Sequence, residues 1–354
     1  MPRIKRPNEL HAVDFFCSGG GMTCGLRQAG IEVIAGIDND PQCKETYEKN
    51  NPGTQFILAD VFDLKEKELS KQLNLKRNDD NLILIGCSPC QFWSIIQTSK
   101  KKAEKSKNLL VEFKRFVDYL NPGYVLVENV PGILARKDES GLAAFIEDLE
   151  RKGYSVHYEV VNMSEHGVPQ MRKRFSLIAS RLHKEPLKLS KEASYFPLVK
   201  DVIGKEKGFK SIPAGYHDKT DTQHSTANLT QKNLERLEKT KKNGGSWLDW
   251  AEDPKLKRKS YKGKEFKDNY GRMRWDKPAP TITTKFASIS NGRFAHPEEN
   301  RGISLREGAT LQTFPADYVF HTESFGVAAR IIGNAVPPAF AKKLGKRIVN
   351  AHKT

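Results

Sequence analysis

Two cysteines in the first half of the chain are separated by two residues, a spacing found in metal-binding and reactive cysteine pairs. Cys87 and Cys90 form the run Cys-Ser-Pro-Cys-Gln directly after the apolar stretch LILIG at 82–86. Such a pair can hold zinc, act as a redox pair, or contain a single nucleophile. The other three cysteines do not supply the second pair that a zinc site needs, and the aromatic lead-in of a thioredoxin-like pair is missing. We therefore favour Cys90, presented after Pro89, as a nucleophile for an electron-poor carbon.

Charged residues stand at the ends of two other predicted strands. Glu128 ends the apolar run YVLVE, and its carboxyl group is a candidate acid or hydrogen-bond partner for the same substrate. Arg172 and Arg174 precede the run FSLIA and alternate, so we expect both on one face. Two guanidinium groups there would form a fork for a carbonyl oxygen or a phosphate.

A second group of residues is typical of a nucleotide-like ligand. The run Ser-Gly-Gly-Gly at 18–21 follows the apolar stretch AVDFF, and its glycines permit a tight turn and close approach of a ligand. Asp38 ends the second apolar run, where an acid accepts hydrogen bonds from ribose hydroxyls, and Asp60 follows the third. NAD and S-adenosylmethionine both satisfy this pattern. The absence of Gly-x-Gly-x-x-Gly spacing favours a ligand without phosphates.

The elements that would position these residues alternate between strands and helices. Helical periodicity is clear at 109–120, where apolar residues recur on one face, and is also present at 41–50 and 338–351. This alternation predicts an α/β fold with a mostly parallel sheet. The predicted strands are 12–16, 33–37, 55–59, 82–86, 124–128, 155–161 and 175–179.

Charge and composition divide the chain and restrict its partners. The net charge is +16, and residues 181–276 alone hold 23 Lys and Arg against 14 Asp and Glu. Such an excess favours a polyanion, with nucleic acid ahead of an anionic membrane. No apolar run reaches membrane-spanning length, and no secretory signal opens the sequence. We expect a catalytic and cofactor-binding domain at 1–181, a smaller basic domain at 182–276, and a C-terminal part at 277–354 that packs back on the first domain.

Five motifs follow one another along the chain: Pro89-Cys90-Gln91, Glu128-Asn129-Val130, Gln170-x-Arg172-x-Arg174, Arg274-Trp-x-x-Pro278-x-Pro-Thr281 and Gly333-Asn-Ala-Val-Pro-Pro338. In this order they resemble the motifs of the DNA (cytosine-5) methyltransferase family. The resemblance covers nearly the whole chain except the basic region, where this family carries its variable target-recognition domain. Three positions depart from the family's usual pattern: Ser18 replaces a glycine, Asp38 stands where Glu is common, and Trp93 where Phe is common.

The resemblance implies a Rossmann-like S-adenosylmethionine-dependent methyltransferase fold and a specific reaction. Cys90 would add to C6 of a flipped-out cytosine in a specific double-stranded DNA sequence, which activates C5 for methylation. Glu128 would hydrogen-bond N3 and the exocyclic amine. Arg174 would hold O2, with Arg172 in support, and Asn129 would order the nucleophile loop. The lysine-rich segment 91–108 would close over DNA. From its residues, Gly244-Gly245-Ser246-Trp247 is either a loop that enters a groove or a plain surface turn.

The resemblance also implies a set of cofactor-binding residues and no metal. S-adenosylmethionine would be the methyl donor and S-adenosylhomocysteine the product. The residues implied are Phe16, Gly19, Gly20, Gly21, Asp38, Asn39, Asp60, Val61, Pro89, Leu109, Asn334 and Ala335.

The expected setting is a bacterial restriction–modification system. We expect a cytoplasmic, nucleoid-associated monomer that binds double-stranded DNA, has no membrane partner, and works beside a cognate restriction endonuclease. Three alternatives remain open. A tRNA cytosine-5 methyltransferase shares the chemistry, but its Cys-Phe-Thr signature is missing from the basic region. A catalytically inactive DNA-binding module would not need Cys90, Glu128 and Arg174 together, and a nicotinamide oxidoreductase would leave Pro89-Cys90-Gln91 and Gly333–Pro338 unexplained.

Overall fold

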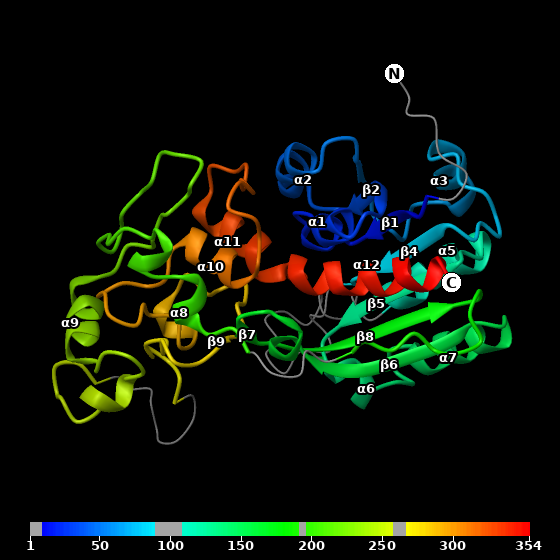
Figure 1. The fold of residues 1–354 in the computed structure, drawn as a ribbon. Helices are drawn as coiled ribbons and strands as arrows, with labels where there is room; N and C mark the ends of the chain where they lie inside the picture. Colours follow the sequence, from blue (N-terminus) through cyan, green and yellow to red (C-terminus); the bar gives the residue numbers. More distant parts are fainter. Residues whose placement is uncertain (1–8, 89–107, 191–195, 258–266) are drawn as a thin grey trace. The chain divides into compact units, whose positions relative to one another are not determined.

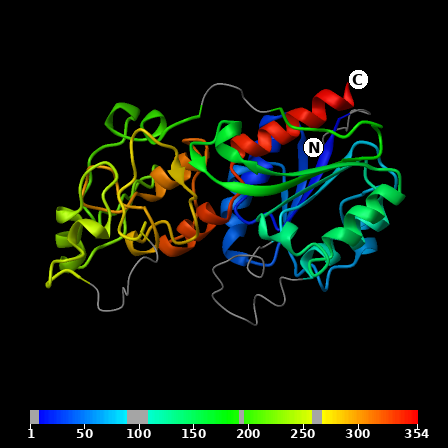
Figure 2. The ribbon, with the colours of Figure 1, turned by 90° about the horizontal axis from the view of Figure 1, so that it is seen from below.

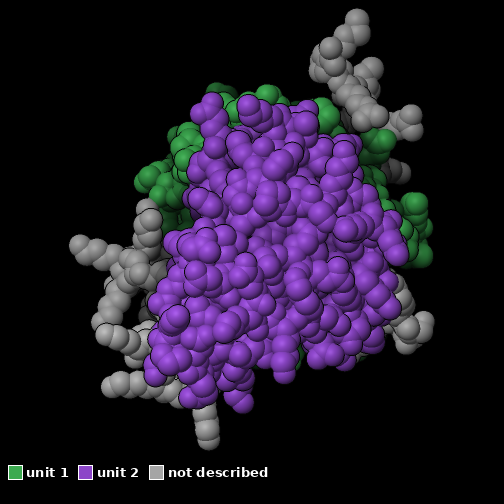
Figure 3. Space-filling model, turned by 90° about the vertical axis from the view of Figure 1, so that its left-hand side faces the viewer, with its two compact units in different colours: residues 1–162, 173–191, 338–354 green, residues 163–172, 192–337 purple. Residues whose placement is uncertain are grey.

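The computed structural model describes residues 9–88, 108–190, 196–257 and 267–354 (Figure 1). The chain folds into two compact units, coloured separately in Figure 3. Unit 1 comprises residues 1–162, 173–191 and 338–354, and unit 2 comprises residues 163–172 and 192–337. The stretch 277–354, expected as one C-terminal part, is thus divided: its last 17 residues belong to unit 1 and the rest to unit 2.

Unit 1 is built on a seven-stranded sheet with the order β3-β2-β1-β4-β5-β8-β6. Five neighbouring strands pair in parallel, and β8 runs antiparallel to both β5 and β6. The predicted α/β class with a mostly parallel sheet is confirmed, and each predicted strand is present within a few residues. The strands are β1 (His11–Phe15), β2 (Glu32–Asp38), β3 (Gln55–Leu58), β4 (Leu82–Gly86), β5 (Tyr124–Asn129), β6 (Ser155–Asn162) and β8 (Lys173–Ser180).

Helices cover both faces of this sheet, as side-chain alternation along β1 requires. Phe15 packs with Phe113 and Phe116 of α5, whereas Asp14 points to the opposite face and accepts a hydrogen bond from Thr23 of α1. Figure 2 shows α12 on one side of the sheet and α5 and α7 on the other. The helices of unit 1 are α1 (Gly21–Gln28), η1 (Pro41–Cys43), α2 (Lys44–Asn50), α3 (Glu66–Gln72), α5 (Leu109–Leu120), α6 (Gly132–Ala135), α7 (Leu142–Arg151) and α12 (Pro338–His352).

The C-terminal helix α12 packs closely against α1 because two glycines allow it. A Cβ atom on Gly25 would lie 2.3 Å from the Pro338 carbonyl oxygen, and one on Gly345 would lie 2.7 Å from the Cβ of Ala29. Neither position has room for a side chain. The helix predicted at 338–351 is therefore confirmed, and its contact with the first helix links the two ends of the chain within unit 1.

The described part of unit 2 has little regular structure and one small two-stranded sheet, in which β7 and β9 pair in parallel. One of its apolar clusters contains Leu237, Trp250, Leu256 and Tyr270. In the described part of the chain, no helix is both long enough and apolar enough to cross a membrane. The elements of unit 2 are η2 (Met163–His166), β7 (Gln170–Met171), α8 (Val199–Val202), η3 (Lys205–Lys207), α9 (Gln231–Lys239), η4 (Trp247–Trp250), β9 (Ala279–Pro280), η5 (Ile289–Asn291), α10 (Leu305–Leu311) and α11 (Phe325–Asn334).

Candidate active site

The glycine-rich segment forms a tight turn between β1 and α1. Phe16, Ser18 and Gly20 all have left-handed backbones, with φ values of 62°, 47° and 86°. The Gly20 amide donates to the Cys17 carbonyl, and Gly20 is the N-cap of α1. The predicted strand–turn–helix is confirmed. The left-handed φ also gives a reason why glycine suits position 18 better than serine does.

Asp38 ties this turn to the end of β2. Its Oδ2 accepts from the Ser18 amide at 2.8 Å and its Oδ1 from the Asp40 amide at 2.9 Å. Burial raises the pKa of the Asp38 carboxyl group, and these backbone hydrogen bonds oppose that rise. A carboxylate oxygen accepts more than one hydrogen bond, so a carboxylate oriented in this way can still accept from a ligand hydroxyl.

Six of the residues that the sequence predicted for the cofactor line one pocket in unit 1: Phe16, Asp38, Asn39, Asp60, Val61 and Leu109. The pocket holds about 380 Å³ of empty space, including space open to solvent. Three further lining residues were missed, namely Phe15, Ile37 and Ala59. Each lies at or next to the end of a predicted strand, and this position could have identified it as a lining residue.

The other predicted cofactor residues have different locations. Gly19, Gly20 and Gly21 form the turn and the start of α1. Asn334, which is exposed, and Ala335, which is buried, belong to unit 2. Pro89 lies outside the described residues, as do Cys90 and most of the 91–108 segment.

Glu128 and Arg174 meet at the end of β5. Antiparallel pairing of β5 with β8 brings the two residues together, and Arg174 Nε lies 3.2 Å from Glu128 Oε1. Both side chains are largely buried. A guanidinium beside a carboxyl group at a strand end offers one donor and one acceptor group to the same planar substrate.

Asn129 connects this strand end to the segment that leads to Cys90. Its Nδ2 donates to Ser88 Oγ at 3.0 Å, and its Oδ1 accepts from the Val130 amide. Ser88 follows β4, which is the parallel neighbour of β5. The side chain of Asn129 therefore holds Ser88, the last described residue before position 89.

Arg172 does not share the surroundings of Arg174, contrary to the predicted two-arginine fork. It belongs to unit 2, is 3% exposed, and donates to the carbonyls of Ile282 and Ala335 at 3.0 and 3.2 Å. The chain leaves β7 before Arg172 and enters β8 after it, so simple strand alternation does not extend across both arginines. Arg172 thus orients backbone around Ala335.

Buried arginines organise the rest of unit 2. Arg272 is completely buried and donates to the carbonyls of Leu237, Thr240, His296 and Glu299. Burial lowers its pKa to about 10. Arg236 and Arg306 likewise donate to backbone carbonyls. These three arginines of unit 2 therefore stabilise its fold, and the net charge of the sequence does not distinguish them from exposed cations.

A buried ionic cluster lies beside Arg272. Arg301 pairs with Glu307 at 2.7 Å, and His296 Nε2 lies 3.8 Å from Glu307. Although burial opposes ionisation, the hydrogen bonds and charge of Arg301 lower the pKa of Glu307 to about 2. Burial also lowers the pKa of His296 to about 4.

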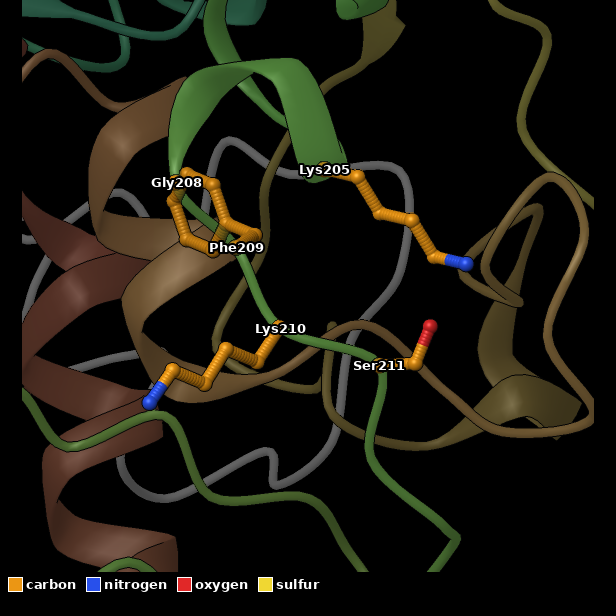
Figure 4. Close-up of a pocket in the computed structure, with 5 residues that line it drawn as sticks. All are labelled: Lys205, Gly208, Phe209, Lys210 and Ser211. Atoms are coloured by element: carbon orange, nitrogen blue, oxygen red, sulfur yellow. The ribbon is translucent and has the colours of Figure 1, made fainter.

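The lysines of unit 2 are mostly exposed. One open pocket is lined by Lys205, Gly208, Phe209, Lys210 and Ser211, and its side chains are shown in Figure 4. His224 supports the wall of this pocket. Its Nε2 lies 2.9 Å from the Lys210 carbonyl oxygen, and its ring packs edge-on against the ring of Phe209. Among the described residues, no three His, Cys, Asp or Glu side chains form a group that could hold a metal ion.

Comparison with known proteins agrees with this architecture. The family model of the C-5 cytosine-specific DNA methylases matches residues 10–350. A Type II methylase of Herpetosiphon aurantiacus, M.HgiDII, is 40% identical over 95% of this chain and 94% of its own length. The Type II methyltransferase M1.HphI of Haemophilus parahaemolyticus is 29% identical over 96% of this chain and 87% of its own.

Solved structures share the fold at lower identity. A prophage-encoded protein of Escherichia coli has a TM-score of 0.71 at 21% identity, covering 98% of this chain and all of its own. The Entamoeba histolytica methyltransferase EhMeth has a TM-score of 0.65 at 14% identity, covering 97% of this chain and 98% of its own. Because the family model spans nearly the whole chain, the protein belongs to the C-5 cytosine-specific DNA methylases and is a DNA (cytosine-5) methyltransferase.

Proposed function

We propose that this enzyme methylates C5 of a cytosine flipped out of a specific double-stranded DNA sequence, through a covalent bond between Cys90 and C6. The observation that carries the proposal is the Glu128–Arg174 pair at the end of β5, beside the strand that leads to Cys90. Flipping is required because C5 and C6 are inaccessible within a stacked duplex, and it costs a few kcal/mol. The Type II relatives support a role in a restriction–modification system.

The residues act on the cytosine ring in sequence. The Cys90 thiolate forms the S–C6 bond, and its electron pair makes C5 nucleophilic. Glu128 hydrogen-bonds N3 and the exocyclic amine, while Arg174 stabilises charge that develops at O2. After C5 is methylated, a base or water removes the C5 proton. The S–C6 bond then breaks and the thiolate is regenerated.

In this proposal the pocket at the ends of β1, β2 and β3 would hold the methyl donor. S-adenosylmethionine, when bound, supplies the methyl group and leaves as S-adenosylhomocysteine. Asp38 would accept from the ribose hydroxyls and Asp60 from the adenine amine, with Phe16, Val61 and Leu109 as apolar walls. Gly19, Gly20 and Gly21 would let the backbone approach the ligand. For Asn39, Pro89, Asn334 and Ala335 the assignment rests on the resemblance.

Residues 182–276 supply target recognition in this proposal. Exposed lysines such as Lys205 and Lys210 would contact phosphates, since phosphate contacts position a protein on DNA and carry much of its affinity. The proposed setting is a nucleoid-associated monomer in the cytoplasm that acts beside a cognate endonuclease.

The test is methyl transfer from tritiated S-adenosylmethionine to mixed-sequence duplex DNA and, separately, to bulk tRNA, followed by bisulfite sequencing. We expect label at C5 of cytosine within one short DNA sequence, and none with Cys90→Ala. Label in tRNA alone would retain the nucleophile and change the substrate. No label in either, with S-adenosylmethionine bound, would favour the inactive DNA-binding module.

A further inference from the structure

A surface turn in unit 2, Lys241–Asp249, is held in place by hydrogen bonds from several neighbouring side chains and backbone groups. Asp249 Oδ2 accepts from the amides of Lys241 and Ser246 at 3.1 and 2.9 Å. Arg293 Nη1 donates to the carbonyls of Gly244 and Gly245 at 2.7 and 3.1 Å. The buried Arg272 donates its own amide to the Gly245 carbonyl.

The glycines of this turn are required by its packing. Gly244 has a φ of 118°, and a Cβ there would lie 2.9 Å from Arg274 Cγ. A Cβ on Gly245 would lie 2.4 Å from both Asp249 Oδ2 and the Lys241 carbonyl. The turn is thus held in one conformation from several sides, as is expected of a preorganised contact surface.

Asn243 is fixed at the exposed edge of this turn with a defined orientation. Its amide donates to the Pro297 carbonyl at 2.8 Å, and its Oδ1 accepts from the Trp275 amide at 2.7 Å. A backbone N–H can bond only the oxygen of the side chain, so the assignment of Oδ1 and Nδ2 is settled. With Oδ1 bonded to the Trp275 amide, this exposed side chain still offers the donors of Nδ2.

The same turn carries an apolar side chain. Leu248 in η4 is 54% exposed, although both of its neighbours in the sequence are less exposed and the turn around it is rigid. Donors and an apolar group carried by one turn match the major-groove edge of DNA, where guanine presents two acceptors, N7 and O6, and pyrimidines present an apolar C5 edge.

We propose that the turn Lys241–Asp249 reads bases in the major groove, with Asn243 donating to guanine N7 and O6 and Leu248 covering the C5 edge of a neighbouring pyrimidine. The proposal rests on the proposed function, since it names the residues through which the DNA-methylating enzyme would choose its sequence.

Asn243→Asp tests the reading because it retains the acceptor for Trp275 and the tolerance for a left-handed φ, but replaces the donors with an acceptor. Asn228→Asp is the matched control: Asn228 is also exposed in unit 2, and its Oδ1 accepts from the Leu229 amide at 2.9 Å. Methylation of a duplex library randomised around the target cytosine measures discrimination at each position.

We expect Asn243→Asp to reduce discrimination at one guanine position by about 10- to 100-fold and to leave the other positions unchanged. Asn228→Asp should change the rate equally for all sequences. Replacing that guanine with 7-deazaguanine should slow the unaltered enzyme and leave Asn243→Asp unaffected. Identical sequence profiles for the two Asp variants would overturn the role of Asn243.

Leu248→Ala, compared with Val160→Ala at an exposed position of β6, tests the apolar contact. We expect kcat/KM on the preferred duplex to fall about tenfold for Leu248→Ala only, and equal values for the two variants would overturn this part. If the unaltered enzyme methylated no DNA, the proposed function itself would fail. That outcome is separate from methylation with unaltered sequence preference.

Discussion

The Glu128 carboxyl group lies against one guanidinium in a buried strand end, where little water screens the pair. Electrostatic interactions with a bound base are stronger in such surroundings than in water. The carboxyl group of Glu159, which pairs with His157 of the same strand, is more exposed and therefore better screened by water.

Glu128→Gln should therefore slow methyl transfer by about 10²- to 10⁴-fold, because an amide cannot stabilise the positive charge that N3 gains. Binding of S-adenosylmethionine should remain nearly unchanged. Single-turnover kinetics with tritiated donor and an equilibrium binding measurement check both expectations. Glu159→Gln serves as the control, and normal turnover in Glu128→Gln would remove this residue from the mechanism.

Ser18 has a left-handed backbone conformation that costs folding free energy. Its φ of 47° suits glycine, and the left-handed conformation costs most other residues roughly 1–2 kcal/mol. Ser18→Gly should therefore raise the free energy of unfolding by about 1 kcal/mol, measured by thermal denaturation. Ser155→Gly in β6 should have the opposite sign, since glycine weakens a strand. A lower melting temperature for Ser18→Gly would contradict this account.

At the scale of elements, hydrogen bonds from the short segment 170–172 of unit 2 connect motifs that lie far apart in the sequence. Gln170 Nε2 donates to the Leu311 carbonyl and to Gln312 Oε1, and Gln312 Nε2 donates to the Ile332 carbonyl at 2.6 Å. Arg172 bonds the Ala335 carbonyl. These side chains join β7, the end of α10 and the end of α11 through buried hydrogen bonds. Gly333 completes the arrangement, since a Cβ there would lie 2.3 Å from the backbone of Thr283.

Gln312→Leu should destabilise unit 2 by about 2–4 kcal/mol, because it leaves several buried polar groups without partners at about 1–3 kcal/mol each. Tryptophan fluorescence during urea unfolding would follow the change. Gln231→Leu, at an exposed position of α9, should change stability by less than about 0.5 kcal/mol. Equal effects at the two positions would show that the buried bonds contribute little.

At the scale of the whole molecule, Asp14 in unit 1 and His296 in unit 2 should make pH-dependent contributions to stability of opposite sign. In unit 1, burial raises the pKa of Asp14 from 3.8 to about 7. The folded state then holds a proton that the unfolded state has lost, so the contribution of Asp14 to the stability of unit 1 falls as pH rises from about 4 to 7. In unit 2 the pKa of His296 falls from 6.5 to about 4. Unit 2 therefore loses stability as pH falls through that range, and Glu307 extends the loss between about 4.5 and 2.

Hydrogen exchange followed by mass spectrometry would measure the two units separately between pH 4 and 8. We expect Asp14→Asn to flatten the pH dependence of unit 1 and His296→Asn to flatten that of unit 2 above pH 4. A pH dependence that neither substitution changes would refute the assignment.

Salt dependence should reveal which cations contact DNA. Lys205→Ala in the open pocket should weaken binding equally for all sequences and reduce the slope of log K against log salt by about 1. Lys71→Ala, exposed on α3 of unit 1, is the control. Fluorescence anisotropy with duplex DNA at several salt concentrations measures both, and an unchanged slope for Lys205→Ala would exclude this phosphate contact.

Local patterns in the sequence determined the sheet, the glycine turn and most of the pocket that follows it. Apolar runs, glycines and strand-end acids act over a few residues, so these patterns were sufficient to place Asp38 and Asp60 at one edge of the sheet, whereas Phe16 and Leu109 were added by the family resemblance. The motif order was likewise sufficient to identify the family, because motif order survives large changes between the motifs.

Only the tertiary structure decided how charge is used. Arg172 and Arg174 are two residues apart, yet one bonds the backbone of unit 2 and the other pairs with Glu128 in unit 1. Arg272 and Lys241 add equally to the net charge, although one is buried among carbonyls and the other exposed. Burial and hydrogen-bond partners arise from contacts between residues far apart in the chain, and composition and spacing carry no record of those contacts.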